Sequence, residues 1–286
     1  MQYTCNICGA VNDCQVYQLG REKPDCRGCG SNVRMRAVIG LLSHELFGAR
    51  LPIDAFPRDP GIRGVGLSDW DAYAERLGTR LSYTNTYYHQ EPLLDITCIP
   101  EHQVGSCDFL ISTDVFEHVL PPVGLAFTGA RQLLKEGGVL ILTVPYMVEP
   151  ADTIEHFPSL HEWALEQDNG GAWRLENKRS DGSLEVFTEL VFHGGPGSTL
   201  EMRLFSLQSL LDELRKAGFS SARKNSLRRL CGSATSRVPR PVSISTSWEP
   251  VSTSRQWQAS SPRRTIDSVR PSMSLPPTGQ VEMQLR

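Results

Sequence analysis

The sequence predicts an α/β fold built on a doubly wound, mostly parallel sheet. Short apolar runs alternate with amphipathic stretches from residue 33 to about residue 222, which is the pattern of strands covered by helices on both faces. Two of these runs, Cys107–Thr113 and Val139–Val144, are almost continuously apolar, as expected for strands buried inside a sheet. The chain has 286 residues, of which 40% are hydrophobic and 21% charged. This length and composition suit one large domain and a small module.

The periodicity of each run assigns the elements of the central zone. In chain order they are a helix over 33–47, a strand over 62–67, a helix over 70–77, a strand over 81–88, a strand or the loop at its end over 93–97, a strand over 107–113, a helix opened by Pro121-Pro122, a strand over 139–144 and a helix over 205–217. Ser68 or Asp69 can cap the second helix, and Gly137-Gly138 can end the third. We expect the stretch from about residue 146 to residue 200 to form an irregular insertion beside the strand ends, because this stretch has little periodicity.

The C-terminal segment has a different composition. Ser, Thr and Pro make up 25 of the 62 residues over 225–286, which also contain nine Arg and no Lys. Such a segment has few large apolar side chains with which to build a core, so it is predicted to be disordered or poorly packed. Two origins are open: a genuine extension of the protein, or a product of translation out of frame. The expected divisions are therefore a Cys- and Gly-rich module over 1–32, an α/β domain over 33–224 and a tail over 225–286.

The charge distribution excludes some classes of partner. Residues 223–286 hold 11 of the 29 Lys and Arg residues but only 3 of the 32 Asp and Glu residues. The rest of the chain is therefore acidic, which argues against nucleic acid as the main partner. No apolar run reaches the length of a membrane span, and the first residues lack the pattern of a signal peptide. A cytoplasmic location is the resulting expectation.

Four cysteines form two CxxC pairs near the N-terminus, Cys5 with Cys8 and Cys26 with Cys29. Their spacing is that of a tetrahedral zinc site, and a glycine follows each pair, as in zinc knuckles. A module of this size has too few apolar residues to fold by burial alone, so metal binding would supply its folding energy. Four thiolates leave no open coordination position. The sequence therefore predicts a structural zinc ion.

Two segments carry the most specific signal in the chain. Residues 108–119 read DFLISTDVFEHV, and residues 133–145 read LLKEGGVLILTVP. Together they resemble the fourth and fifth strand motifs of class I S-adenosylmethionine-dependent methyltransferases, with Glu136 in place of the usual Pro. The resemblance covers about residues 60–145. It implies a Rossmann-like methyltransferase fold and S-adenosylmethionine as cofactor.

The resemblance also implies a cofactor site at the carboxyl ends of the strands. Gly66 would let the methionine part approach the backbone, Asp95 would lie near the adenine, and Asn85 would replace the family's ribose-binding acid. The motif departs from the family pattern because no acidic residue precedes the glycines. The expected cofactor-binding residues are Gly64, Gly66, Asp69, Asn85, Asp95, Ile96, Ser112, Thr113 and Asp114.

Glu117 and His118 are the expected catalytic residues, as a base near the methyl acceptor. Two other interpretations remain. The pair can cap and orient the helix after Pro121, or it can bind a divalent cation with Asp114, as in some small-molecule methyltransferases of the superfamily. Other polar and aromatic side chains of the insertion are expected to line a substrate pocket; these are His156, His161, Trp163 and His193.

The leading functional hypothesis is a methyltransferase that acts on an oxygen or nitrogen of a small molecule or glycan. One alternative is an RNA methyltransferase, because some rRNA methyltransferases also carry an N-terminal zinc module. Another is an interaction protein with a degenerate methyltransferase fold. Sheets of this class normally finish with two further strands, one of them antiparallel. No good candidate follows Phe219, so the sequence predicts an incomplete sheet edge.

Overall fold

A computed structural model describes residues 2–15, 19–149, 152–225, 245–247 and 279–285. It confirms the predicted α/β fold: the main sheet has the order β15-β14-β16-β6-β5-β3-β4, with β13 paired to β6 and β7 paired to β13. The strands of this sheet are β3 (Asp59–Leu67), β4 (Leu81–Thr86), β5 (Cys107–Thr113), β6 (Leu134–Met147), β7 (Ile154–Glu155), β13 (Arg203–Ser206), β14 (Ser221–Asn225), β15 (Ser245–Ser247) and β16 (Gly279–Leu285).

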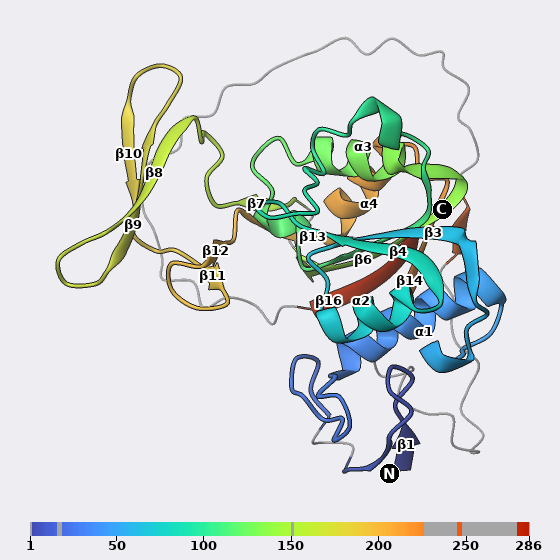
Figure 1. Ribbon diagram of the computed structural model, residues 1–286. Helices are drawn as coiled ribbons and strands as arrows, with labels where there is room; N and C mark the ends of the chain where they lie inside the picture. The colour runs from blue at the N-terminus through green and yellow to red at the C-terminus, as the bar shows by residue number, and fades with distance from the viewer. Residues whose placement is uncertain (1, 16–18, 150–151, 226–244, 248–278, 286) are drawn as a thin grey trace.

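Helices cover both faces of the sheet (Figure 1). The helices and short 3-10 turns are α1 (Val33–Phe47), η2 (Ile53–Ala55), α2 (Asp71–Gly78), η3 (Glu101–Gln103), η4 (Phe116–His118), α3 (Gly124–Leu133) and α4 (Leu207–Lys216). One core lies between the sheet and α3 and α4. A second core lies between the sheet and α1 and α2. Among the described helices, none is long and apolar enough to cross a membrane.

The order of the parallel strands creates a switch point between β3 and β5. From β3 the chain passes through α2 to β4 on one side, and then returns to β5 on the other side. Leu67 pairs with Thr86 of β4 and with Ser112 of β5, so the carboxyl ends of the three strands lie together. In open α/β sheets this is where ligands bind.

Two local predictions were wrong. Neither Ser68 nor Asp69 caps α2; Trp70 occupies the N-cap position without a side-chain hydrogen bond. The Asp69 carboxyl instead turns inward, where the Tyr83 hydroxyl donates to it. Gly137-Gly138 does not end α3, because the helix stops at Leu133 and β6 begins at Leu134. Residues 93–97 contribute only an isolated bridge, between Leu93 and Tyr87.

The prediction of an incomplete sheet edge was also wrong. β16 lies between β6 and β14 and is antiparallel to both, so it completes the sheet as the class I pattern requires. The sequence does contain a signal for it, because Val281, Met283 and Leu285 alternate with polar residues. The predicted disorder of the tail concerns residues 226–244, 248–278 and 286, which lie outside the described part of the chain.

The insertion is more regular than expected. A three-stranded antiparallel sheet formed by β8 (Glu162–Gln167), β9 (Trp173–Lys178) and β10 (Leu184–Phe187) projects away from the main sheet (Figure 1). A short hairpin of β11 (Phe192–His193) and β12 (Thr199–Leu200) follows it. The chain then returns along β13, which pairs with β6 beyond the end of β5. The insertion therefore leaves and rejoins the fold beside the carboxyl ends of the parallel strands.

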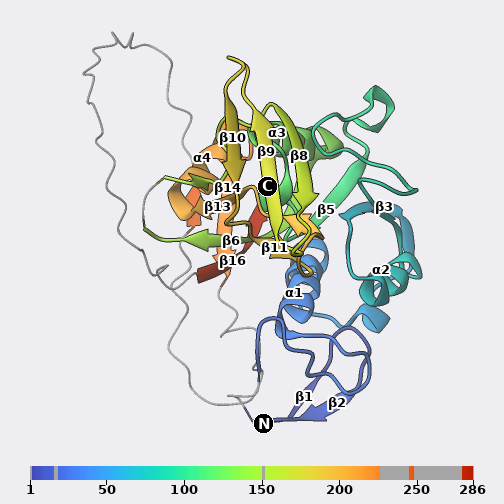
Figure 2. The same ribbon diagram turned by 90° about the vertical axis from the view of Figure 1, so that its left-hand side faces the viewer.

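The N-terminal module contains a small hairpin of β1 (Gln2–Thr4) and β2 (Val11–Asp13). It packs against α1, which Figure 2 shows directly above it. Cys5, Ile7 and Cys26 belong to the same buried cluster as Val38 and Ile39 of α1. The module is therefore continuous with one of the two cores of the α/β domain.

Candidate functional site

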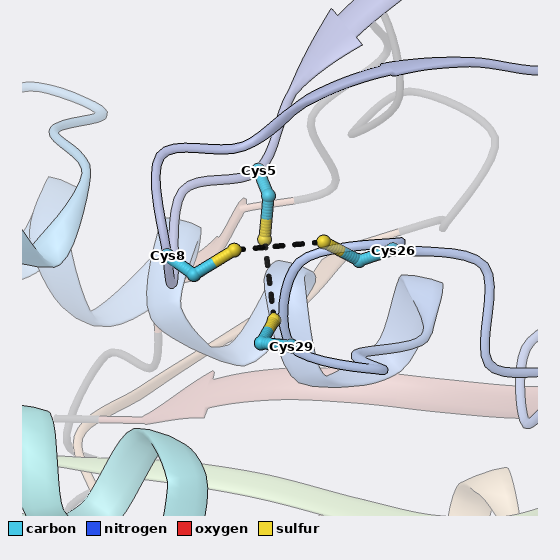
Figure 3. A group of neighbouring side chains, drawn as sticks. All are labelled: Cys5, Cys8, Cys26 and Cys29. Atoms are coloured by element: carbon cyan, nitrogen blue, oxygen red, sulfur yellow. Dashed lines mark hydrogen bonds between the residues drawn. The ribbon is translucent and has the colours of Figure 1, made fainter.

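The four predicted cysteines converge on one point (Figure 3). The Sγ atoms of Cys5 and Cys29 are 3.8 Å apart, and those of Cys8 and Cys26 are 3.5 Å apart. Ligands around a tetrahedral zinc ion with Zn–S bonds of about 2.3 Å lie about 3.8 Å from one another. The cluster therefore has the dimensions of a four-thiolate zinc site.

Backbone turns build the cysteine cluster. Gly9 and Gly30 adopt φ values of 75° and 74°, and their amides donate to the carbonyls of Cys5 and Cys26 at 2.8 Å. Only such turns let both cysteines of each pair face the same point. Burial raises the pKa of the Cys26 thiol, but the amides of Cys29 and Gly28 outweigh this effect and lower it to about 6. This favours the thiolate of Cys26, whereas burial raises the pKa of Cys5 and raises that of Cys8 to about 12, so a bound metal would have to displace those protons.

The module also reaches the carboxyl end of β5. The Arg21 guanidinium lies 3.0–3.2 Å from both carboxylate oxygens of Asp114. Arg34 of α1 approaches the same carboxylate at 3.5 Å and is itself held by Glu22. Although burial raises the pKa of Asp114, the two guanidinium groups outweigh it and lower that pKa below its ordinary value. Asp114 is therefore an ionised, paired carboxylate, and Arg21 is a site residue that the sequence analysis missed.

Asp69 occupies the center of the switch point. Its side chain is buried, and burial raises its pKa to about 7. The Asn85 carboxamide holds the backbone of Asp69 from both sides, because its oxygen accepts from the Asp69 amide and its nitrogen donates to the Asp69 carbonyl, each at 2.9 Å. Asn85 thus fixes the Asp69 loop, and its nitrogen also donates to the Tyr87 hydroxyl at 3.0 Å.

Gly64 and Gly66 leave room for protein side chains. A Cβ atom on Gly64 would lie 2.0 Å from the Phe109 ring, and one on Gly66 would lie 2.0 Å from the Tyr83 hydroxyl. The rings of Tyr83 and Phe109 stack with centroids 5.8 Å apart. These contacts give both glycines a packing reason that the sequence analysis did not consider.

The remaining predicted cofactor residues fall into two groups. Ser112 and Thr113 end β5 at the switch point and Asp114 follows directly, and the Ser112 side chain is fully buried. Asp95 and Ile96 lie farther along the chain in a turn beside α3. There the Asp95 carboxylate accepts from the amide and the hydroxyl of Thr97, at 2.8 and 2.7 Å.

Three buried oxygen atoms near the switch point have no hydrogen-bond partner among the described residues. They are Asp69 Oδ1, Tyr73 Oη and Ser112 Oγ. The Asp69 carboxyl and the Tyr73 hydroxyl still interact with each other and with Thr113 through poorly aligned contacts, whereas Ser112 Oγ has no such neighbour. Buried polar atoms of folded proteins are nearly always paired with protein, water or ligand. A ligand with several hydrogen-bond donors, such as the hydroxyl, amino and ammonium groups of S-adenosylmethionine, fits this set.

Glu117 and His118 form a second polar cluster with two residues of the insertion. His118 Nε2 lies 2.8 Å from His193 Nδ1, and both atoms are about 4 Å from Glu117 Oε1. His193 Nε2 lies 3.1 Å from a carboxylate oxygen of Glu201. His156 approaches the other Glu201 oxygen at 3.0 Å. The insertion thus brings His193 and His156 beside Glu117 and His118; that they line a substrate pocket stays a prediction. His161 and Trp163 are exposed on the outlying sheet.

Burial and neighbouring charges set the electrostatics of this second cluster. Burial and the Asp114 charge raise the pKa of Glu117 well above its ordinary value. Burial lowers the pKa of His118. The hydrogen bond with Glu201 raises the pKa of His193, and although burial opposes it, the contacts with His156 and His193 lower the pKa of Glu201 to about 2.

Arg203 fixes the turn that carries this pair. It is a fully buried arginine, and its Nη1 donates to the carbonyls of Phe116 and Val119 at 2.9 and 2.6 Å. Its Nε donates to Glu155 at 2.7 Å. Arg203 and Glu201 flank Met202, whose amide donates to the Glu117 carbonyl at 2.8 Å. The sequence signal for these residues was weak, because they lie more than 80 positions after Glu117.

No protein-family model matches the chain, and no curated protein matches it. Among solved structures, an S-adenosylmethionine-dependent methyltransferase from Clostridium acetobutylicum ATCC 824 is 12% identical, with 56% of this chain and 73% of that chain covered at a TM-score of 0.34. The 1,6-didemethyltoxoflavin-N1-methyltransferase of Burkholderia thailandensis is 12% identical, with 69% and 73% covered at a TM-score of 0.39.

A third structure, an S-adenosylmethionine-dependent methyltransferase from Mesorhizobium loti, is 14% identical, with 64% of this chain and 84% of that chain covered at a TM-score of 0.29. Each TM-score is below 0.5. The activity must therefore be argued from the residues of this chain.

Proposed function

We propose that the chain is an S-adenosylmethionine-dependent methyltransferase whose cofactor binds at the switch point between β3 and β5. The observation that carries the proposal is Ser112 Oγ, a buried oxygen without a partner among the described residues, beside the buried carboxyl of Asp69 and hydroxyl of Tyr73. These groups lie at the strand ends of a doubly wound sheet, where such folds bind ligands, and leaving Ser112 unpaired would cost about 1–3 kcal/mol.

The proposed cofactor residues follow from their positions. Asp69, Ser112, Thr113 and Asp114 would face the cofactor, with Asp95 and Ile96 at the adenine end. Asn85 would act by holding the Asp69 loop, since its carboxamide is already bonded to that loop. Gly64 and Gly66 would leave the space that the rings of Phe109 and Tyr83 occupy. When bound, the cofactor would supply an electrophilic methyl group on its sulfonium.

The acceptor in this proposal is a small molecule or glycan. The described cluster of Glu117, His118 and His193 lies beside the strand ends, and the acidic character of residues 1–222 disfavours RNA. The residues of the cluster would contact the acceptor, with Glu117 and His118 nearest the cofactor side. Zinc in the four-cysteine cluster would be structural, because four thiolates complete its coordination.

A second candidate function is that of a binding module without catalysis. The observation that favours it is the packing of Phe109 and Tyr83 into the space beside Gly64 and Gly66. If that packing replaced the cofactor contacts of the glycine motif, the fold would persist without methyl transfer.

Isothermal titration of the full chain with S-adenosylmethionine separates the two functions. We expect binding, and we expect Ser112→Ala to weaken it about 5- to 100-fold, the equivalent of about 1–3 kcal/mol. Ser106→Ala at the opposite end of β5 is the matched control and should leave the affinity unchanged. Absence of any binding by the wild-type chain would favour the module without catalysis.

A further inference from the structure

We propose that Glu117, His118 and His193 form an open, three-ligand site for a divalent first-row transition-metal ion, separate from the four-cysteine cluster. The ligand atoms are a carboxylate oxygen of Glu117, Nε2 of His118 and Nδ1 of His193, which all lie within 4.8 Å of one another. Two segments far apart in sequence supply them: η4, directly after β5, and β11, inside the insertion.

The hydrogen bonds of the two histidines point both lone pairs at the same place. His118 Nδ1 lies 2.8 Å from the Leu200 carbonyl, which can only accept, so Nδ1 carries the hydrogen and Nε2 carries the lone pair. His193 Nε2 lies 3.1 Å from the Glu201 carboxylate, so the lone pair of the neutral ring is on Nδ1. Two lone pairs that face each other at 2.8 Å require a proton or a cation between them.

The outer contacts are those that metal-bound histidines use. A ligating histidine commonly donates its second N–H to a carbonyl or a carboxylate, which fixes the ring and raises its basicity. His118 uses the Leu200 carbonyl and His193 uses Glu201. Glu201 is held in turn by His156 at 3.0 Å.

Glu117 provides the independent evidence for a cation. Its side chain is fully buried, with 0% exposed, and both carboxylate oxygens have no hydrogen-bond partner among the described residues. A buried carboxyl without a partner keeps its proton unless a cation binds it. Asp114, which the sequence analysis grouped with Glu117 and His118, is instead paired with Arg21 and Arg34. The ligand set is therefore Glu117, His118 and His193.

The chemistry of the ligands selects the metal. Two imidazoles and one carboxylate suit Zn²⁺, Mn²⁺, Fe²⁺ or Co²⁺ better than Mg²⁺ or Ca²⁺, which prefer all-oxygen sites. Metal–nitrogen bonds of about 2.0–2.1 Å place neighbouring ligands about 2.9–3.4 Å apart, so the two histidines need to separate by only a few tenths of an ångström. Three protein ligands leave a position open for an oxygen ligand such as water.

The site would also tie the insertion to the sheet. His193 is the only proposed ligand from the insertion, and the same hairpin also reaches η4 through the Leu200 carbonyl, which lies 2.8 Å from His118 Nδ1. If the proposed function holds, the open position would receive an oxygen of the methyl acceptor. Metal binding itself does not depend on the proposed function, and it can be measured without the cofactor.

Titration of the full chain with Co²⁺, after its cysteine cluster has been filled with Zn²⁺, tests the proposal. We expect one equivalent of Co²⁺ to bind, with visible d–d bands and without the thiolate charge-transfer absorption of a cysteine site. Glu117→Gln and His193→Gln should each weaken this binding at least about 10-fold. His161→Gln, on an exposed histidine of the same insertion, is the matched control and should bind as the wild type does.

The thermal unfolding of the same proteins gives a second readout. Co²⁺ should raise the melting temperature of the wild type and of His161→Gln but not that of Glu117→Gln. Metal-free Glu117→Gln should fold, because the amide has the size of the carboxyl and none of the described residues loses a hydrogen-bond partner. A wild-type chain that binds no Co²⁺, or Co²⁺ binding that survives in Glu117→Gln and His193→Gln, would overturn the proposal. Neither result depends on S-adenosylmethionine binding.

Discussion

The four-cysteine cluster and the Glu117–His118–His193 cluster differ in how the chain assembles them. The cysteines come from two turns of one short module, with sulfur atoms spaced as around a tetrahedral ion. The other cluster joins a turn after β5 to a hairpin that lies more than 70 residues farther along the chain. The first set is closed and composed of one ligand type, which suits a structural role. The second is mixed and open, which suits the binding of a further ligand.

The largest expected effect is on the free energy of unfolding, which a substitution in the cysteine cluster should lower and one in the Glu117–His118–His193 cluster should not. Cys26→Ser should lower the free energy of unfolding by more than about 5 kcal/mol, since structural zinc supplies about 10–16 kcal/mol of folding energy, and the loss should reach α1 because Cys26 shares its core. Metal-free Glu117→Gln should unfold at the same temperature as wild type or higher. Zinc analysis and thermal unfolding measure both, with Cys14→Ser as the control. Equal destabilisation by both variants would show that the two clusters do not differ in their contribution to folding.

The second prediction concerns the turn that carries Glu117 and His118. Arg203→Met should destabilise the chain by about 3–5 kcal/mol, because it strands the carboxylate of Glu155 and two backbone carbonyls. Arg174→Met, on an exposed ion pair, should change stability by less than about 1 kcal/mol. Urea unfolding monitored by circular dichroism would distinguish them, and a small effect of Arg203→Met would mean that the turn is held by other contacts.

Asp69 and Glu117 are both buried carboxyl groups, and Asp69 has the partner that Glu117 lacks. Its folded pKa of about 7 lies above its unfolded value of about 4. The stability that this group contributes is therefore fully present below pH 4 and is lost as the pH rises through 7, a change of about 4 kcal/mol. Asp69→Asn should flatten the pH dependence of unfolding between pH 4 and 8, whereas Asp71→Asn, at an exposed position, should not. An unchanged slope in Asp69→Asn would show that the carboxyl is ionised in the folded state.

The smallest expected effect tests whether the cysteine module acts beyond its own fold. Arg21→Ala should destabilise the chain by about 1.5–3 kcal/mol, because it removes the bidentate partner of Asp114. Lys23→Ala, two residues away and exposed, should change stability by less than about 0.5 kcal/mol. Chemical denaturation measures both variants. Equal effects of Arg21→Ala and Lys23→Ala would show that the contact of Arg21 with Asp114 does not stabilise the chain.

Local patterns in the sequence predicted the elements whose signal is short-range. The span of α1 and that of β5 are as expected, because each has a complete apolar pattern and a clear terminus. The cysteine cluster was equally predictable, since its ligands lie in two short motifs. The N-cap of α2 was not predictable, because the carboxyl of Asp69 is taken up by Tyr83, a tertiary contact that overrides capping preference.

Long-range contacts account for the rest of the candidate site. Arg21 reaches Asp114 across 93 positions, and His193 reaches His118 across 75. No periodicity relates such residues, so their roles depend on how the insertion and the module fold back on the sheet. β16 had an alternating pattern, but its Ser- and Pro-rich surroundings concealed it.

The position of β16 has a consequence for how the chain is made. β6 and β14 are synthesised well before β16, which must later enter between them and pair with both. Until residues 279–285 leave the ribosome, the apolar strand β6 has no partner on that edge, and an unpaired edge can recruit other chains. A ribosome that stops early would therefore release a protein with both clusters complete and its sheet open.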